Sequence, residues 1–389
     1  MTMQFDFDSV YDRRGSGSLK WDLPKDEGVI PLWVADMDFK TAPCVTKALK
    51  DRVEHGIFGY EMVPEAWYEA IASWLLKRCD LRIDKDWLIP VPGAVPALSA
   101  ALKAITLPGD QVITFTPAYN CFFSSIRNTG CELSPSHLLW QNGSWKIDFK
   151  DLKEKASQER ARAILLCNPH NPTGRLWTGD ELEQIASIAC DYDLYVISDE
   201  IHSDIRPQGS AFTSLATIDE SFRLKSVILN APSKAFNLAG CQNAYMLIKD
   251  PDLRERCDRA VNINEVCDVN PFGVAATIAA YNEGSEWLDA MNAYIRENLN
   301  IASGIIKKEL SKAAFSIPDA GYLLWLDLKA YGKSSEKLFE TMLKHKVMLN
   351  RGTDYGPAED GFMRLNTACP RALLEEGLSR VVAAVKDPD

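Results

Sequence analysis

Asn171, Asp199 and Lys234 are three polar residues that each follow a short, mainly apolar stretch of the chain. The stretches that precede them are residues 163–167, 194–198 and 226–229. We expect each stretch to be a buried strand of a parallel sheet. Ligands of such sheets bind beyond the carboxyl ends of the strands. The pattern therefore predicts that an amide, a carboxylate and an amine meet at one edge of one sheet.

This combination of side chains suits a pyridoxal phosphate (PLP) cofactor. Asp199 beside the pyridine nitrogen would stabilise the nitrogen's proton and raise its pKa, so that the ring can act as an electron sink. Asn171 can donate its amide N–H to the phenolic oxygen of the ring. Lys234 can bond to the aldehyde if burial and neighbouring charge lower the pKa of its amine. We therefore predict that Lys234 and Asp199 are catalytic and that Asn171 binds the cofactor.

The phosphate group and the ring face of PLP need further partners. A helix that opens after Gly93 offers the backbone N–H groups of Ala94 and Val95, and helix N-termini bind phosphate. Tyr119 follows the predicted strand 112–115 and can stack its aromatic face on the ring. We assign Tyr119 to both the catalytic and the cofactor-binding residues.

Each of these residues also has an ordinary structural interpretation. Asp199 alone could cap a helix or join a buried ion pair, and residues 168–174 (Asn-Pro-His-Asn-Pro-Thr-Gly) alone would form a tight turn. Ala94 and Val95 could open a helix that binds nothing, and Tyr119 could belong to the core. The occurrence of all of them together, in this order along the chain, favours the cofactor site.

The elements around these residues predict an α/β fold. Helical patterns lie between the apolar stretches, and one of them begins with the capping-box pair Thr178 and Glu181. Alternating strands and helices predict a mainly parallel sheet that is covered by helices on both faces. The predicted strands are 112–115, 163–167, 194–198, 226–229 and 244–248, and the predicted helices include 97–105 and 181–190.

The last third of the chain has a different pattern. A long helical pattern covers residues 287–310, and strand-like segments follow at 322–328, 347–349 and 362–365. This mixture predicts a smaller α/β domain. We therefore expect three parts: an N-terminal segment, 1–50, that packs with the small domain, a large PLP-binding domain, 51–284, and the small C-terminal domain, 285–389.

Composition and charge limit the classes of partner. The chain has 389 residues and a formal net charge of −11, whereas nucleic acids and anionic membranes prefer basic surfaces. It contains no signal-peptide pattern and no apolar run of about 18 residues, so we expect no membrane span. Ten scattered cysteines without a CxxC pair predict reduced thiols in a cytoplasm and no metal site.

The sequence resembles fold-type I PLP enzymes of the class I/II aminotransferase superfamily over nearly its whole length. Residues 168–174, 199–202 (Asp-Glu-Ile-His) and 233–237 (Ser-Lys-Ala-Phe-Asn) carry this resemblance. More narrowly, the chain is similar to the bacterial cystathionine β-lyase and cystalysin-type C–S lyase branch. The motifs for the branch are 34–39 (Val-Ala-Asp-Met-Asp-Phe), 55–60 (His-Gly-Ile-Phe-Gly-Tyr), 199–204, 233–240, 361–366 and 369–371. The resemblance implies a sheet of the seven-stranded type in the large domain.

The resemblance also implies roles for four further residues. Ser233 and Tyr60 would bind the cofactor phosphate, and Tyr60 would do so in the neighbouring subunit, so a homodimer with shared active sites is expected. Arg364 would hold the α-carboxylate of the substrate with its bidentate guanidinium group. His202 stands where many aminotransferases carry a Tyr that contacts the phenolic oxygen. The structural alternatives are a surface ion pair for Arg364 and a core position for Tyr60.

One departure from the family pattern bears on the reaction. Gln242 stands where many class I aminotransferases carry an Arg that binds the phosphate. The lyase branch tolerates this loss, so the departure favours a PLP-dependent C–S β-lyase. Such an enzyme converts L-cystathionine, L-cysteine or related S-conjugates to pyruvate, ammonia and a thiol such as homocysteine. An aminotransferase with the same residues is the main alternative, and a non-catalytic regulatory protein with this fold is a third.

Overall fold

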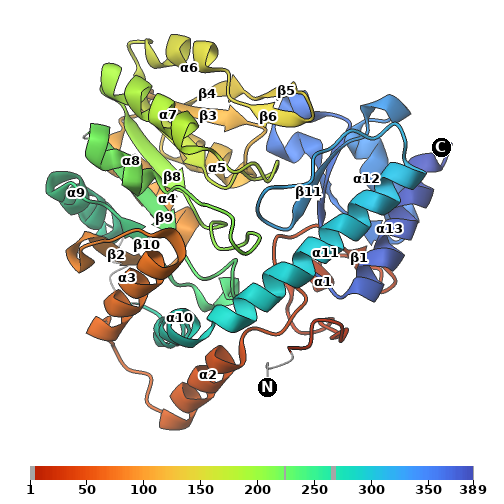
Figure 1. Cartoon of the computed structure of the whole chain (residues 1–389), viewed down its shortest axis with the longest axis horizontal. Coiled ribbons are helices and arrows are strands. Elements are labelled where there is room, and N and C mark those ends of the chain that lie inside the picture. The colour runs from red at the N-terminus through yellow and green to blue at the C-terminus, as the bar shows by residue number, and fades with distance from the viewer. Residues whose placement is uncertain (1–4, 223–224, 264–268, 389) are drawn as a thin grey trace.

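The structure is a computed structural model that describes residues 5–222, 225–263 and 269–388. Its centre is a seven-stranded sheet in the order β2-β10-β9-β8-β7-β3-β4 (Figure 1). From β9 to β4 all neighbouring strands are parallel, and β10 is antiparallel to both of its neighbours. The strands are β2 (Leu88–Val91), β3 (Gln111–Thr116), β4 (Glu132–His137), β7 (Ala161–Cys167), β8 (Tyr195–Asp199), β9 (Lys225–Asn230) and β10 (Ala244–Leu247). The predicted mainly parallel sheet is confirmed.

The five strands predicted for this sheet are present, with ends that differ by one or two residues. The two strands without a sequence prediction, β2 and β4, are the two edges of the sheet. Each contains a proline, Pro90 in β2 and Pro135 in β4, and proline is tolerated only at edges because it has no N–H for the ladder. β10 is antiparallel to β9, and the connecting residues 231–243 form turns and a short 3₁₀ helix, Ala239–Cys241, without the crossover α-helix that usually joins parallel strands.

Helices cover both faces of the large sheet because its central strands are apolar on both sides. In β7, Ala163 and Leu165 face one layer, and Ile164 and Leu166 face the other. The first layer contains α4 (Ala94–Ile105), α5 (Asn120–Asn128) and α9 (Pro251–Asn262). The second contains α3 (Glu65–Cys79), α6 (Phe149–Ala156), α7 (Gly179–Asp191), α8 (Leu215–Phe222) and α10 (Pro271–Glu283). The predicted capping box begins α7.

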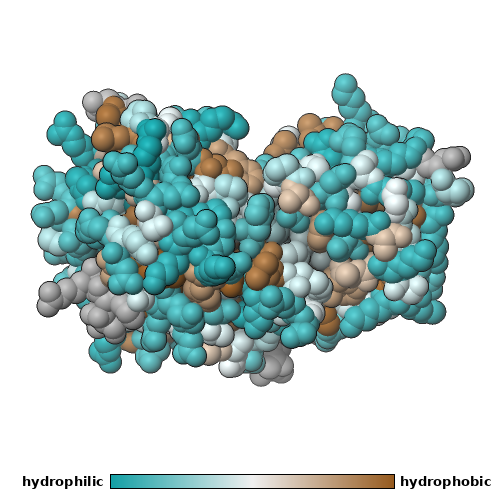
Figure 2. All heavy atoms as spheres, turned by 90° about the horizontal axis from the view of Figure 1, so that it is seen from above, coloured by the Kyte–Doolittle hydropathy of each residue, from teal (hydrophilic) through white to brown (hydrophobic). Residues whose placement is uncertain are grey.

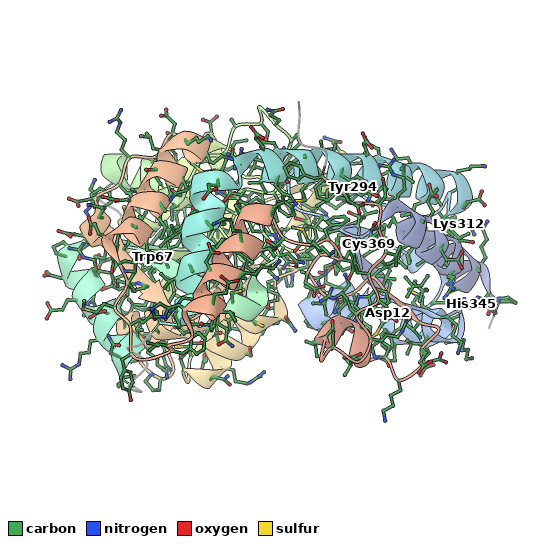
Figure 3. The ribbon with its side chains drawn as sticks, turned by 90° about the horizontal axis from the view of Figure 1, so that it is seen from below. Asp12, Trp67, Tyr294, Lys312, His345 and Cys369 are labelled. Atoms are coloured by element: carbon green, nitrogen blue, oxygen red, sulfur yellow. The ribbon has the colours of Figure 1, made fainter. Side chains whose placement is uncertain are left out.

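A second, smaller α/β unit follows α10. Its antiparallel sheet has the order β11-β14-β13, and α11, α12 and α13 pack with it around a separate apolar cluster. Figure 3 shows α11, marked by Tyr294, extending from the large unit along the small one. The elements are α11 (Ser285–Glu309), β11 (Leu323–Asp327), α12 (Ser335–Lys344), β13 (Asn350–Arg351), β14 (Phe362–Asn366) and α13 (Arg371–Lys386).

The N-terminal segment contacts both units. After the short helix α1 (Leu19–Asp22), strand β1 (Ile30–Pro31) pairs in parallel with β12 (Val347–Met348) of the small unit. An added Cβ on Gly377 of α13 would lie 2.6 Å from Leu32, so this part of the segment packs tightly on the small unit. Helix α2 (Pro43–His55), in contrast, packs against α10. The boundaries at residues 50 and 284 stay a prediction.

The surface is mostly hydrophilic on the face that Figure 2 shows, and an indentation separates two unequal bodies. Within the described ranges, no helix combines the length and the apolar character that crossing a membrane requires.

Candidate active site

A cavity of about 500 Å³ opens at the carboxyl ends of β7, β8 and β9. It brings together every residue that the sequence predicted for the site except Tyr60. These are Ala94, Val95, Tyr119, Asn171, Asp199, His202, Ser233, Lys234 and Arg364. The roles of the individual residues stay predictions, which the geometry below supports.

Asp199 is a buried carboxylate at the last position of β8. Its Oδ1 accepts a hydrogen bond from the backbone N–H of Ile201 at 3.1 Å. Burial raises the pKa of Asp199 to about 6, although this hydrogen bond and the charge of Lys234 act in the opposite direction. A buried carboxylate is costly without a positive partner. A protonated ring nitrogen placed against Asp199 would supply that partner.

Lys234 lies in the turn that follows β9. Its Nζ donates a hydrogen bond to the backbone carbonyl of Ala35 at 2.7 Å. Burial, helped by the positive charge of Arg364, lowers the pKa of Lys234 to about 8, while the charges of Asp36 and Asp199 act in the opposite direction. A larger fraction of this amine is therefore neutral near pH 7 than of an exposed lysine, and a neutral amine can act as nucleophile or base.

Arg364 is a cation in β14, only 4% exposed, without a carboxylate partner among the described residues. Its Nη1 donates to Asn171 Oδ1 at 3.1 Å, and its Nη2 donates to the Trp33 carbonyl at 2.9 Å and to Asn350 Oδ1 at 3.0 Å. The guanidinium carbon lies 4.8 Å from the centre of the Tyr355 ring, and Nε has no hydrogen-bond partner. All of its partners are neutral, so the charge of Arg364 is available for an anionic ligand in the cavity.

The loop 168–174 positions Asn171 beside Arg364. Because the Oδ1 atom of Asn171 accepts from Arg364, its amide N–H groups point elsewhere, and they have no acceptor among the described residues. Gly174 closes the loop with φ +69°, and an added Cβ would lie 2.1 Å from Pro318, so only glycine fits here. The loop thus presents a free donor in the cavity.

His202 follows β8 in a turn. The turn is fixed by bonds from the N–H of Ser203 to the Glu200 carbonyl and from the N–H of Ile205 to the His202 carbonyl. Burial lowers the pKa of His202 to about 3, and the charges of Lys234 and Arg364 lower it further, so the imidazole is neutral.

The start of α4 and Tyr119 form another part of the wall. Gly93 is the N-cap of α4, so the N–H groups of Ala94 and Val95 lie in the first turn, where no intrahelical acceptor exists. Tyr119 is the N-cap of α5 and presents its ring to the same cavity. Burial raises the pKa of the Tyr119 hydroxyl well above its usual value, so it stays protonated.

Several wall residues were not predicted. Trp33, Ala35, Cys121, Asn350 and Tyr355 all line the cavity. Ala35 lies inside the motif 34–39, which indicated the branch but carried no assigned role. Cys121 lies in the first turn of α5, two residues after Tyr119, whereas Trp33, Asn350 and Tyr355 come from the N-terminal segment and the small unit, so their place depends on the whole fold. Gln242, noted above as a departure, also lines the cavity.

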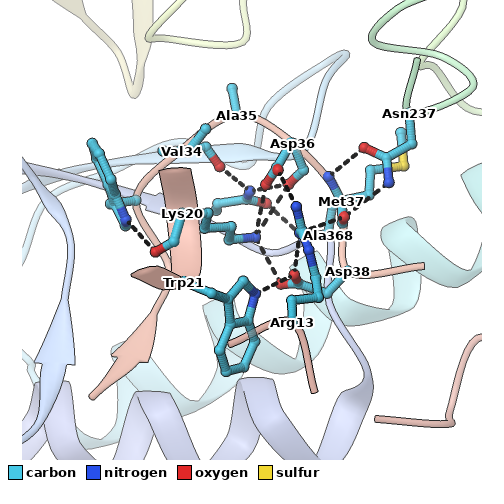
Figure 4. A network of polar contacts seen from close by, with 12 residues as sticks. Arg13, Lys20, Trp21, Val34, Ala35, Asp36, Met37, Asp38, Asn237 and Ala368 are labelled. Carbon is cyan, nitrogen blue, oxygen red and sulfur yellow. Dashed lines mark hydrogen bonds and ion pairs between the residues drawn. The ribbon is translucent and has the colours of Figure 1, made fainter. Parts of the chain in front are cut away.

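A buried ionic network holds the segment that contains Trp33 and Ala35 (Figure 4). Asp38 accepts hydrogen bonds from Lys20, Arg13 and Trp21, each at 2.7 Å. Arg13 also pairs with Asp36 at 2.8 Å. The pKa of Lys20 is raised, because the charges of Asp38 and Asp36 outweigh the opposing effect of burial.

Segment 33–38 is fixed from both units. Asn237, three residues after Lys234, bonds to the N–H and carbonyl of Met37, and Asn366 donates to the carbonyls of residues 34 and 36. The Ala35 carbonyl accepts a hydrogen bond from Lys234, and the Trp33 carbonyl accepts one from Arg364. One short piece of backbone therefore contacts both cationic residues of the cavity.

Tyr60 does not line the cavity of its own chain. It lies between α2 and α3 and is 95% exposed. The core position that was considered for Tyr60 is therefore excluded.

Comparison with known proteins identifies the family. The sequence model of "Aminotransferase class I and II" matches residues 27–381. The chain belongs to this family. Cystathionine β-lyase PatB of Bacillus subtilis is 40% identical to it, over 97% of this chain and 99% of that protein.

Solved structures of similar proteins in this family contain PLP. Cystalysin of Treponema denticola, described with a pyridoxal 5'-phosphate cofactor, superposes with a TM-score of 0.96 and 34% identity over the whole of both chains. The PLP-bound C–S lyase of Staphylococcus hominis superposes with a TM-score of 0.92 and 32% identity over 99% of both chains.

Proposed function

We propose that this chain is a PLP-dependent carbon–sulfur β-lyase. Its substrate is L-cystathionine, or L-cysteine and related S-conjugates, and its products are pyruvate, ammonia and a thiol such as homocysteine. The main observation behind this proposal is the cavity that places Lys234, Asp199 and the buried cation Arg364 together. The full-length identity to a cystathionine β-lyase supports the choice of reaction.

The residues of the cavity fit PLP by charge and by hydrogen-bonding capacity. The amides of Ala94 and Val95 and the hydroxyl of Ser233 suit a phosphate. Asp199 suits a protonated pyridine nitrogen, and Asn171 has a free donor for the phenolic oxygen. The aldehyde would be held by Lys234. Each of these chemical features of the cofactor is thus met by a side chain or amide of the cavity, and the bonds that Lys234 and Asp199 make in the protein are to neutral backbone groups.

The residues of the chain then divide the work on an amino-acid substrate. Arg364 holds the α-carboxylate through its planar guanidinium group, and this orients the α-hydrogen. Lys234 takes the α-proton, a role for which its lowered pKa suits it. When bound, PLP withdraws electrons from the α-carbon and so makes its proton acidic. The electron pair freed at the α-carbon forms a double bond to the β-carbon while the carbon–sulfur bond breaks, and sulfur leaves as a thiolate that takes up a proton. The aminoacrylate that remains reacts with water to give pyruvate and ammonia.

A turnover assay tests the reaction type. We expect purified protein with PLP to produce pyruvate from L-cystathionine without any added keto acid, because elimination needs only a leaving group on the β-carbon. Alanine has no such group and is expected to be a poor substrate. If the protein yields no pyruvate and consumes amino acids only when a keto acid is added, the aminotransferase alternative is correct.

Arg364→Lys is expected to raise KM for every amino-acid substrate while PLP affinity changes little. Lysine keeps the charge but loses the two-pronged geometry, and one hydrogen bond to a charged group contributes about 1.5–3 kcal/mol. Steady-state kinetics with L-cystathionine and L-cysteine, together with a PLP titration, measure both effects. An increase restricted to one substrate would place Arg364 in a side-chain pocket instead.

The proposal includes a homodimer with shared active sites. The loop between α2 and α3 exposes four large apolar side chains, Ile57, Phe58, Tyr60 and Met62. Clustered exposed apolar residues favour a protein interface. In this arrangement Tyr60 reaches the cofactor phosphate of the partner subunit, where it adds a donor that compensates for Gln242.

Tyr60→Phe is expected to weaken PLP binding by about 1.5–3 kcal/mol without dissociating the dimer, because it removes one hydrogen bond to a charged group and keeps the ring. PLP titration and light scattering measure the two properties. Met62→Leu is the control, since Met62 is also exposed and has no proposed phosphate contact. A fully active monomer would refute the shared site.

Two further expectations complete the proposal. The net charge of −11 favours a small-molecule role without nucleic-acid or membrane partners, and the scattered cysteines favour a cytoplasmic location. Elution from immobilised DNA without retention, whatever the salt concentration, would support the first expectation. Fractionation of cells would test the second.

A further inference from the structure

A second cavity, of about 310 Å³, lies between the large and small units. One wall is the hairpin of β5 (Leu139–Gln141) and β6 (Ser144–Lys146), and the other includes residues of β11 and β14. None of its lining residues lines the active-site cavity. The proposed reaction therefore makes no use of it.

The walls of this second cavity are aromatic. Trp140 and Trp145 of the hairpin have ring centres 5.2 Å apart, and Trp145 lies 6.3 Å from Phe362. Trp325 stacks on Phe362 at 5.2 Å. The negative faces of such rings attract cations, and tryptophan does so best. Lys329 already places its Nζ 4.5 Å from the centre of the Phe362 ring, so this surface accepts positive charge.

Glu359 adds a buried carboxylate to the same cavity. Its side chain is only 7% exposed, lines the cavity, and has no hydrogen bond or ion pair with any described residue. Burial raises the pKa of Glu359 to about 7; the charge of Lys329 lowers it and that of Asp327 raises it. The ionisable lining consists of these three groups and His137, so carboxylates outnumber ammonium groups. A cationic ligand in the cavity would stabilise the ionised form of this carboxylate, which has no other partner among the described residues.

We infer that this second cavity binds a small alkylammonium compound, with its cationic end against the tryptophan rings and its charge balanced by Glu359. Aromatic walls with a carboxylate form the recognised environment for quaternary ammonium groups. The active-site cavity does not offer this environment, because Lys234 and Arg364 would repel a cation there.

Choline is the probe for the first test, because its nitrogen carries no hydrogen and cannot condense with PLP. Its neutral isostere, 3,3-dimethylbutan-1-ol, has the same shape without the charge. We expect calorimetry on the PLP-loaded protein to show one site for choline, with an affinity at least tenfold higher than for the isostere. Equal affinities, or no binding of choline in the millimolar range, would overturn the inference.

Variants locate the site. Glu359→Gln keeps the size of the side chain and is expected to lower choline affinity tenfold or more, whereas Glu376→Gln, an exposed glutamate on α13, should leave it unchanged. Trp140→Leu removes an aromatic ring that the hairpin contributes to the cavity wall. This variant should fold because Trp140 is 39% exposed. It is also expected to weaken choline binding. Retained affinity in both cavity variants, or loss of binding in Arg364→Lys, would assign choline to another place.

Discussion

Lys234→Ala is expected to lower kcat for pyruvate formation from L-cystathionine by at least about 10³-fold, the scale of a lost general base. The remaining contacts with the phosphate and the ring would still retain some PLP, so the loss is expected in turnover more than in cofactor content. In the unaltered protein, borohydride reduction followed by mass mapping should place the pyridoxyl group on Lys234. An adduct on any other lysine would contradict the central assignment.

Lys225→Ala is the matched control for this variant. Lys225 begins β9, the strand that Lys234 follows, and pairs with Asp193 at the opposite end of the strands from the cavity. Its removal should leave kcat within about twofold, since an exposed ion pair contributes only about 0–1 kcal/mol to stability. Equal losses in the two variants would mean that the lysines act only through folding.

Lys20→Met is expected to lower the free energy of unfolding by about 3–5 kcal/mol, the usual result of removing one partner of a buried ion pair. Lys20 has no exposed side-chain surface, and its partner Asp38 would keep a buried negative charge that only Arg13 and Trp21 still meet. Urea denaturation of the apoprotein, at one protein concentration, measures the change. Because the network holds segment 33–38, kcat should fall as well.

Lys47→Met removes an exposed ion pair, so its effect on the free energy of unfolding can be compared with the effect of losing the buried pair of Lys20. The pair Lys47–Asp51 has the same 2.7 Å separation as Lys20–Asp38, but its side chains are 78% and 58% exposed. Its loss is expected to cost less than about 1 kcal/mol, because water screens exposed charges. Similar effects for the two substitutions would show that the network around Asp38 does not stabilise the fold.

The sequence predicted the centre of the site well because the centre depends on local patterns. β7, β8 and β9 are continuous apolar stretches, and parallel strands carry the residues that follow them to one edge. Asn171, Asp199 and Lys234 therefore reach one cavity by a rule that needs no knowledge of the rest of the fold. The start of α4 is equally local, since a glycine and a helical pattern mark it.

The periphery of the site could not be predicted in the same way. Asn350 and Tyr355 enter the cavity from the small unit, and Trp33 enters from the N-terminal segment, so their positions depend on how the units pack. The edge strand β4 is half polar and contains Pro135, so no apolar pattern marks it.

The pairing of Ile30 with Val347 has a consequence for the order in which the protein can be made. The ribosome releases β1 before the strands of the large sheet, yet β12, the partner of β1, emerges after all of them. The wall proposed to bind the substrate combines Trp33 from the N-terminal segment with Arg364 from the small unit. A growing chain can thus complete its large sheet before the two residues of this proposed wall can come together, which happens only after β14 has emerged.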